Sequence, residues 1–240
     1  MMATSPAPRR LDVWLDTQKI GELREQGNLW AFGYESSWQA SGFDLSPALP
    51  RANGEIVDGA SLRPVQWFFD NLLPEEGSRR LLAQGANLDP ADAFGLLQHY
   101  GPESAGALTL LAPGQKLPEP GLEPLPDEVL SARIRALPRL PLSEGAPKRM
   151  SLAGRAASTH ILKPDHERVD EYPHSAANEW FCMQLAAACG LPVPAVELRQ
   201  VPEPVYLVRR FDRVGDGLEA RRLYALDACQ VLSLDAVFKY

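Results

Sequence analysis

The first part of the chain changes from the two-residue alternation of strands to the spacing of helices. Apolar and polar residues alternate in LDVWL at 11–15 and in KIGEL at 19–23, and LWAFGYESSW at 29–38 is a further aromatic-rich strand candidate. Residues 61–84 then place Trp, Phe and Leu side chains on one helical stripe, which a proline and a glycine interrupt. This order predicts a sheet followed by helices.

Two more elements complete this part of the chain. In LDPADAFGLLQHYG at 88–101, Asp89 fits a helix N-cap, Pro90 fits the first turn and Gly101 fits the C-terminal stop. The following segment, GALTLLAPG at 106–114, has the pattern of a strand. We therefore expect a compact unit that ends near residue 112.

Residues 113–147 differ in composition, because eight of the 22 prolines of the chain fall within them. This segment is typical of a connector, with one short helix expected at PDEVLSARIRAL. Beyond it, Ser175 is the expected cap of a helix. The pattern there predicts, in order, a strand, a helix, two strands and the beginning of another helix, at 158–164, 174–190, 195–201, 205–213 and 221–232.

The elements together predict an α+β fold. We expect an N-terminal β-rich subdomain with helices at 1–112 and a Pro-rich connector at 113–147. A second unit is expected at 148–240. No internal repeat is visible in the sequence.

Composition and charge exclude several classes of function. The formal net charge is -7, which argues against direct binding to nucleic acid or to an anionic membrane surface. No apolar run has the length of a membrane span, and we expect a cytoplasmic location. The three cysteines show no metal-ligand spacing, and Cys182 and Cys189 are expected to be buried structural thiols.

The order of elements in the second unit is that of the small lobe of a protein kinase. A glycine-bearing turn, MSLAG at 150–154, precedes a strand with Lys163 and a helix with Glu179. In kinases a strand lysine holds phosphates and pairs with a helix glutamate. Two other interpretations stay open at this point. Lys163 can be a strand-end lysine with its ammonium in water, and the helix dipole alone favours a glutamate in a first turn.

The particular sequence motifs resemble the HipA family of bacterial toxin kinases. In the first half these are WFFDNLLPEEGSRRLLAQ and DAFGLLQHYGPESAGAL, and in the second half MSLAG, STHILKPD, YLVRRFDR and CQVLSLDAVFKY. The resemblance implies a serine/threonine kinase that uses ATP and magnesium, with a kinase-like small lobe followed by the start of a helical large lobe. It also implies the toxin role in a type II toxin–antitoxin pair. The partner would be a HipB-like antitoxin, through which the toxin reaches operator DNA.

The same resemblance assigns roles to individual residues. Ser151, beside Gly154 in the glycine loop, corresponds to the serine that family members autophosphorylate. Lys163 corresponds to the phosphate-binding lysine, and Glu179 lies on the helix that supplies its partner. The hinge that meets adenine, largely through its backbone, corresponds to Val208, Arg209, Arg210 and Phe211.

Two departures from the family pattern predict a catalytically incomplete chain. The loop after MSLAG is shortened to RAA, and Arg209 stands where glutamate is common in the family. No asparagine follows Asn178, so no Asp-x-x-x-x-Asn motif can be written beyond the hinge, where a kinase places its base and metal ligands. We therefore expect no catalytic or metal-binding residue in this chain, and no kinase activity from the chain alone.

Three interpretations follow. The first is a truncated HipA-type toxin kinase, for which a partner chain would have to supply the large lobe. The second is a module that binds an antitoxin or a sister toxin without chemistry. The third is a decayed gene product, whose uncovered apolar surface would make it prone to aggregate.

Overall fold

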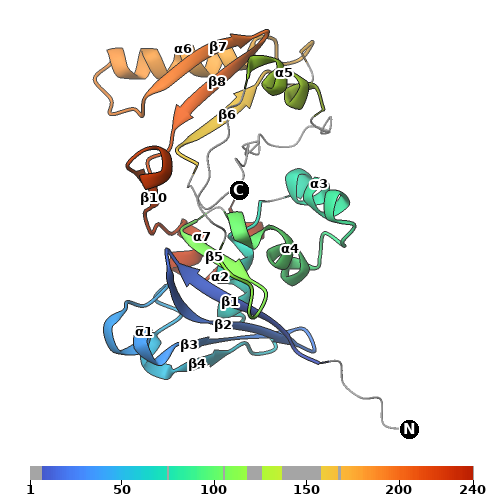
Figure 1. Ribbon diagram of the computed structural model, residues 1–240, viewed down its shortest axis with the longest axis vertical. Helices are drawn as coiled ribbons and strands as arrows, with labels where there is room; N and C mark the ends of the chain where they lie inside the picture. Colours follow the sequence, from blue (N-terminus) through green and yellow to red (C-terminus); the bar gives the residue numbers. More distant parts are fainter. Residues whose placement is uncertain are drawn as a thin grey trace. The chain divides into compact units, whose positions relative to one another are not determined.

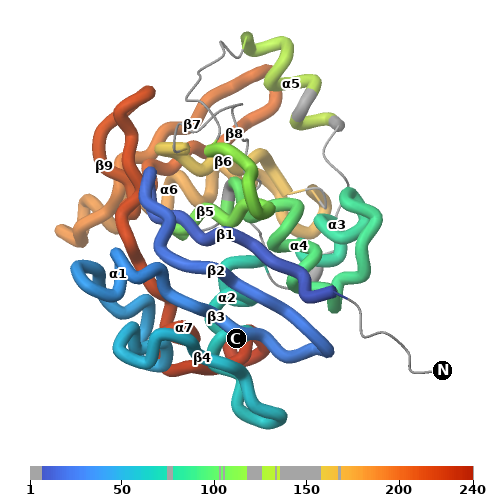
Figure 2. Tube along the Cα trace, turned by 60° about the horizontal axis from the view of Figure 1, so that its bottom comes forward, coloured from blue at the N-terminus to red at the C-terminus, as the bar shows by residue number. Residues whose placement is uncertain are grey.

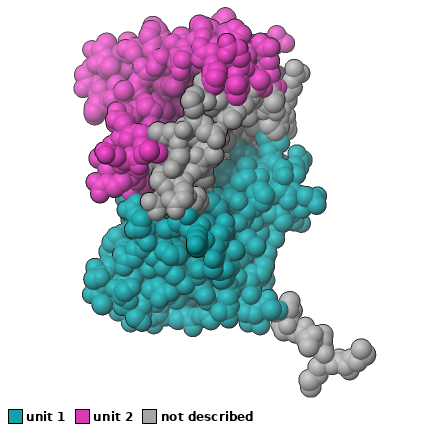
Figure 3. Space-filling view, viewed as in Figure 1, with its two compact units in different colours: residues 1–117, 224–240 teal, residues 118–223 magenta. Residues whose placement is uncertain are grey.

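The computed structural model describes residues 7–74, 76–104, 106–117, 126–136, 158–166 and 169–239. Two compact units make up the chain, one of residues 1–117 with 224–240 and one of residues 118–223 (Figure 3). Within the described ranges, no helix is both long and apolar enough to cross a membrane.

The first unit is built on a five-stranded antiparallel sheet with the strand order β4-β3-β2-β1-β5, and Figure 2 shows its first four strands side by side. Its strands are β1 (Arg9–Leu15), β2 (Gln18–Gln26), β3 (Leu29–Tyr34), β4 (Glu55–Val57) and β5 (Leu108–Leu111). Its first four helices are α1 (Ser36–Ser41), α2 (Pro64–Asp70), α3 (Glu76–Ala86) and α4 (Ala93–Tyr100), with 3-10 turns at Arg51–Asn53 and Gly101–Glu103.

Strand alternation places one face of this sheet against the helices. Leu11 and Val13 of β1, Leu23 of β2 and Phe32 of β3 are fully buried. The ring of Phe32 lies 5.3 Å from that of Phe69 of α2, so the sheet and this helix share one core. Burial of this apolar area is the main stabilising contribution to the unit.

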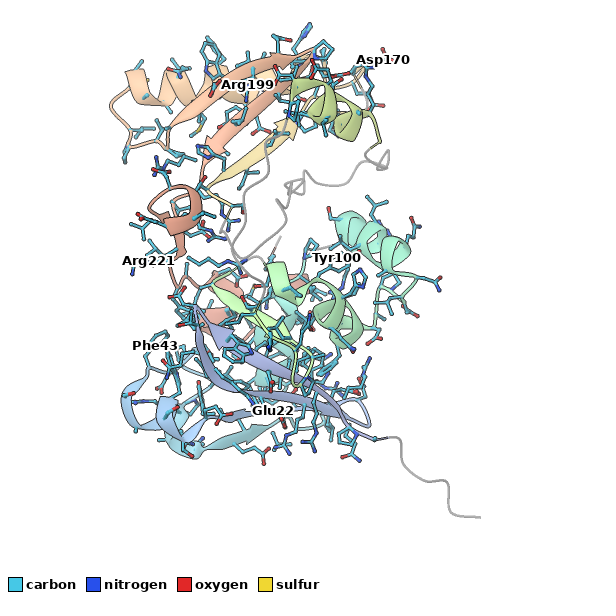
Figure 4. All side chains as sticks on the ribbon, in the orientation of Figure 1. Glu22, Phe43, Tyr100, Asp170, Arg199 and Arg221 are labelled. Carbon is cyan, nitrogen blue, oxygen red and sulfur yellow. The ribbon has the colours of Figure 1, made fainter. Side chains whose placement is uncertain are left out.

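The last residues of the chain fold back into the first unit, where α7 (Ala228–Leu232) lies beside α2 (Figure 1). Gln230 Nε2 donates to the carbonyl of Phe68 at 3.0 Å, and Asn71 Nδ2 donates to the carbonyl of Leu234 at 3.0 Å. The ring of Tyr224 packs edge-on against Phe43, labelled in Figure 4, with centroids 4.9 Å apart. A 3-10 turn, Ala236–Phe238, follows α7.

The second unit contains a three-stranded antiparallel sheet, β6-β8-β7, between two helices. Leu130 of α5 packs on Val201 and Val205 on one face, and α6 lies along the sheet (Figure 1). A two-stranded ribbon, β9-β10, follows. The bounds are α5 (Asp127–Ala136), β6 (His160–Pro164), α6 (Ser175–Ala188), β7 (Val196–Val201), β8 (Glu203–Arg209), β9 (Arg213–Val214) and β10 (Arg221–Arg222), with a 3-10 turn at Gly217–Glu219.

The α+β fold class is confirmed. The predicted boundaries at 112 and 147 stay a prediction, because residues 118–125 and 137–147 lie outside the described ranges. The structure groups α5 with the second unit and residues 224–240 with the first.

Several local predictions were wrong. Asp92, not Asp89, is the N-cap of α4, where its side chain accepts from the Gly95 N–H at 3.0 Å. The stretch expected to be one strand at 29–38 turns into α1 at Ser36. Cys182 and Cys189 are exposed and only Cys229 is buried. Ala176 is the buried residue of α6, so the apolar pattern at 174–190 did not indicate burial of the helix.

Candidate functional site

Lys163 lies on β6, directly opposite Tyr206 of β8. Neighbouring strand residues point to opposite faces, so Leu162 joins the core with α5 while Lys163 points toward α6. The Lys163 ammonium lies 6.0 Å from the centroid of the buried Tyr206 ring, at the outer limit of a cation–π contact. Burial raises the pKa of Tyr206, and the negative charge of Glu179 adds to this effect.

Glu179 of α6 completes an ion pair with this lysine, since Lys163 Nζ lies 2.8 Å from Glu179 Oε2. The two side chains keep 34% and 43% of their exposure, so the pair contributes at most about 1 kcal/mol to stability. The helix begins at Ser175, which makes Glu179 its fifth residue and places it beyond the first turn. The helix dipole therefore does not account for this glutamate, and the ion pair does.

The N-terminus of α6 is held by a residue from the strand side. Asp165 Oδ1 accepts a hydrogen bond from the Ala176 N–H at 2.8 Å and from the Ser175 hydroxyl at 3.4 Å. Ser175 Oγ in turn accepts from the His166 N–H at 2.7 Å. The prediction that Ser175 caps this helix was wrong. His174 holds the N-cap position and makes no side-chain cap bond, and the carboxylate of Asp165 binds the first turn instead.

The predicted hinge begins where β8 ends. The Arg209 N–H donates to the Ala195 carbonyl and the Arg210 N–H to the Thr159 carbonyl, both at 2.9 Å. The Arg209 guanidinium lies 3.2 Å from Asp216 Oδ1, so its charge is engaged within the unit. Phe211 is 85% exposed, which leaves an aromatic ring available at the end of this segment.

A buried ion cluster of Arg210, Asp212 and Arg213 lies at the end of the predicted hinge, and sequence reasoning did not predict it. Arg210 donates to both carboxylate oxygens of Asp212 at 2.8 and 2.6 Å, and Arg213 Nη1 donates to Asp212 Oδ2 at 2.8 Å. Burial alone would raise the pKa of Asp212, but the hydrogen bond from Arg210 and the two positive charges outweigh burial and hold that pKa below its ordinary value. Burial, followed by the charge of Arg210, lowers the pKa of Arg213 to about 10.

The structure therefore brings together some of the predicted site residues. Lys163 and Glu179 form an ion pair. Arg209 is the last residue of β8, the strand that pairs with β6, and Phe211 follows two residues later. Ser151 and Gly154 lie outside the described residues. Among the residues that are described, no three His, Cys, Asp or Glu side chains gather into a possible metal site.

Sequence reasoning also missed two neighbours of the ion pair, Asp165 and Tyr206. A signal for Asp165 was present, because it lies two residues after Lys163 in an extended segment and therefore on the same side of it. No comparable signal marks Tyr206, since its position opposite Lys163 depends on the register between β6 and β8.

Comparison with known proteins agrees with this architecture. The family model of the HipA N-terminal domain matches residues 11–111, and the HipA-like C-terminal domain matches residues 136–240. A solved complex of HipA, HipB and operator DNA from Shewanella oneidensis contains a chain that superposes with a TM-score of 0.76 at 29% identity, over 96% of this chain and 57% of that one.

Two curated proteins are also similar. The serine/threonine-protein kinase toxin HipA of Shewanella oneidensis is 30% identical over 96% of this chain and 57% of its own length. Y4mE of Sinorhizobium fredii, which is named as a candidate kinase, is 36% identical over 97% of this chain and 61% of its own length. The chain thus spans about three fifths of the relatives that it matches. Because two HipA family models match successive parts of the chain and the fold agrees with a HipA structure, the chain belongs to the HipA family.

Proposed function

We propose that this chain carries the nucleotide-binding part of a HipA-type toxin related to serine/threonine kinases. The observation that carries the proposal is the Lys163–Glu179 ion pair at 2.8 Å, which joins a strand lysine to a helix glutamate in a kinase-like small lobe. In kinases such a pair must be in place before the lysine can hold the nucleotide phosphates. Lys163 would contact the phosphates of ATP, Glu179 would orient it, and the backbone from Val208 to Phe211 would face the adenine.

The residues fit the nucleotide better than they fit its metal ion. A partly exposed ammonium, held by one carboxylate, is a suitable phosphate donor. Magnesium is usually bound by one or two carboxylates together with substrate phosphates. The described residues hold no group of three or more His, Cys, Asp or Glu side chains, and no single carboxylate is marked out as a ligand, so we assign no residue to magnesium and derive no step through it.

Binding of magnesium–ATP, measured by calorimetry on the purified chain, tests this proposal. The wild-type chain should bind saturably, and Lys163→Ala should weaken binding by roughly tenfold to a hundredfold, because a charge-assisted hydrogen bond is lost. Lys116→Ala, an exposed lysine of the first unit, is the matched control and should leave the affinity unchanged. Absence of wild-type binding, or equal loss in both variants, would remove the proposal and leave a non-catalytic binding module or a decayed gene product.

We further propose that these 240 residues alone transfer no phosphoryl group. Support comes from the four aspartates after Phe211, each of which has a structural partner. Asp212 bridges two arginines, Asp216 pairs with Arg209, Asp227 caps α7 and Asp235 caps the last 3-10 turn. Mass spectrometry after incubation with magnesium–ATP should find no phosphate on Ser151, with Ser151→Ala as the control. Phosphorylation of Ser151 would contradict the proposal.

We propose a HipB-type antitoxin as the partner and a cytoplasmic location. The solved relative from Shewanella oneidensis is a complex of HipA, HipB and operator DNA, and the acidic charge of this chain favours contact with DNA only through the partner. Co-expression of the chain with a HipB-type protein, followed by affinity purification through a tag on the chain, tests the pairing. Stoichiometric co-purification is expected, and recovery of the tagged chain alone would contradict it.

A further inference from the structure

We propose that Asp165 is a positioning residue for nucleotide binding, and that it acts by setting where Glu179 meets Lys163. This inference rests on the proposed function. Asp165 contacts neither member of the ion pair through a hydrogen bond of the described residues. Its carboxylate instead binds the first turn of the helix that carries Glu179.

The geometry is a two-point attachment between one extended segment and one helix. Lys163 and Asp165 lie two residues apart and both bind α6. On the helix, Ala176 and Glu179 lie three residues apart and therefore on one face, about 4.5 Å apart along the axis. The bond from Asp165 to Ala176 thus fixes the helix one turn before Glu179.

Packing alone holds this helix weakly, which is why a polar attachment matters. Ala176 is the only residue of α6 that is buried, while Phe181 and Leu185 keep more than half of their exposure. A helix with so little buried surface can shift or rotate at small cost. Glu179 lies near the start of the helix, so its place depends on how the first turn is held.

The local hydrogen bonds form a continuous chain around this turn. The His166 N–H donates to Ser175 Oγ, the Ser175 hydroxyl donates to Asp165 Oδ1, and the Ala176 N–H donates to the same oxygen. Asp165 therefore satisfies an N–H group of the first turn that has no partner within the helix.

A double-mutant cycle on magnesium–ATP affinity tests the inference. Asp165→Ala should weaken binding about fivefold to tenfold, as expected for loss of a helix cap that orients a binding group. Asp165→Asn keeps the acceptor oxygen and should stay within about twofold of wild type. In a Glu179→Gln background, Asp165→Ala should add little further loss. The matched control is Asp170→Ala, because Asp170 is an exposed acid in the segment between β6 and α6.

Two results would overturn the inference. If Asp165→Ala weakens binding as much without Glu179 as with it, Asp165 does not act through the ion pair. If Asp165→Asn is as damaging as Asp165→Ala, the charge of Asp165 matters rather than its bond to the helix. Thermal unfolding of each variant, followed by circular dichroism, shows whether any of them has simply lost its fold.

A second readout keeps the inference testable if the chain binds no nucleotide. The side-chain ammonium of Lys163 should give a slowly exchanging ¹H–¹⁵N signal, because its protons are bound to Glu179. This signal should disappear in Glu179→Gln and in Asp165→Ala and persist in Asp165→Asn. Its persistence in Asp165→Ala would contradict the positioning role, whereas absent nucleotide binding with the expected signals would contradict only the proposed function.

Discussion

At the scale of single residues, Asp70 makes the stability of the first unit depend on pH. It ends α2 and pairs with Arg79 of α3, and both side chains keep less than a fifth of their exposure. Burial raises the pKa of Asp70 above its ordinary value of 3.8, although the charge of Arg79 opposes this shift. The negative charge of Asp235 also raises the pKa of Asp70, and the positive charge of Lys239 lowers it.

The sign of the effect follows from this raised pKa. Between pH 3.8 and the folded pKa, the unfolded chain has lost the Asp70 proton while the folded chain retains it. The contribution of Asp70 to stability is therefore fully present below pH 3.8 and is lost as pH rises through the folded pKa. Urea unfolding of wild type and of Asp70→Asn measures this effect. The free energy of unfolding of wild type, relative to that of the variant, should fall as pH rises from 3 to 7. A difference that grows over this range would contradict the assignment.

The residues of the ion pair show how far sequence reasoning could reach. Lys163 could be predicted because it lies in a recognisable strand motif, and Glu179 because it follows on a strongly apolar helix. The position of Asp165 on the side of Lys163 could be predicted from their two-residue spacing, but its role could not, because its partner is a backbone N–H eleven residues further along the chain. Asp58 behaves similarly, since it accepts from the Val65 and Gln66 N–H groups at the start of α2. Caps supplied from another segment leave no local pattern.

At the scale of elements, α7 attaches the end of the chain to the first unit. Asp227 and Gln230 form a capping box, and Gln230 Nε2 also donates to the Phe68 carbonyl at 3.0 Å. Gln230→Ala removes the reciprocal cap and leaves a buried carbonyl without this donor. We expect it to lower the free energy of unfolding by about 1–3 kcal/mol.

Chemical denaturation followed by tryptophan fluorescence measures this loss. Leu232→Ala lies on the same helix, is 66% exposed and should change stability by less than about 0.5 kcal/mol. Equal effects of the two substitutions would show that the helix contributes through its formation alone and not through its contact with α2.

The positions of most elements followed from periodicity, but their ends did not. The alternation at 11–15 and 19–23 correctly indicated β1 and β2, and Gly101 correctly marked the end of α4. The destination of α7 was out of reach, because its attachment to α2 joins residues more than 150 positions apart. Such contacts depend on how the chain returns to the first unit, and local pattern carries no information about that return.

At the scale of the whole molecule, the acidic net charge bears on the proposed indirect contact with DNA. A protein that neutralises phosphates gains affinity as salt is lowered, with a slope set by the number of phosphate contacts. The net charge of -7 makes such contacts unfavourable, and among the described residues Arg9, Arg209 and Arg210 are already paired with carboxylates. Under the proposed pairing with a HipB-type antitoxin, that partner would therefore have to supply the affinity for the operator.

This predicts a clear difference between the chain alone and its complex with a HipB-type antitoxin. In fluorescence anisotropy at about 150 mM salt, a labelled operator duplex should show no saturable binding to the chain alone. The purified complex should bind, with an affinity that falls steeply as salt is raised, and the antitoxin alone should show the same salt slope. Because that slope counts the phosphates contacted, a steeper slope for the complex would mean that this chain touches DNA itself and would contradict the indirect role.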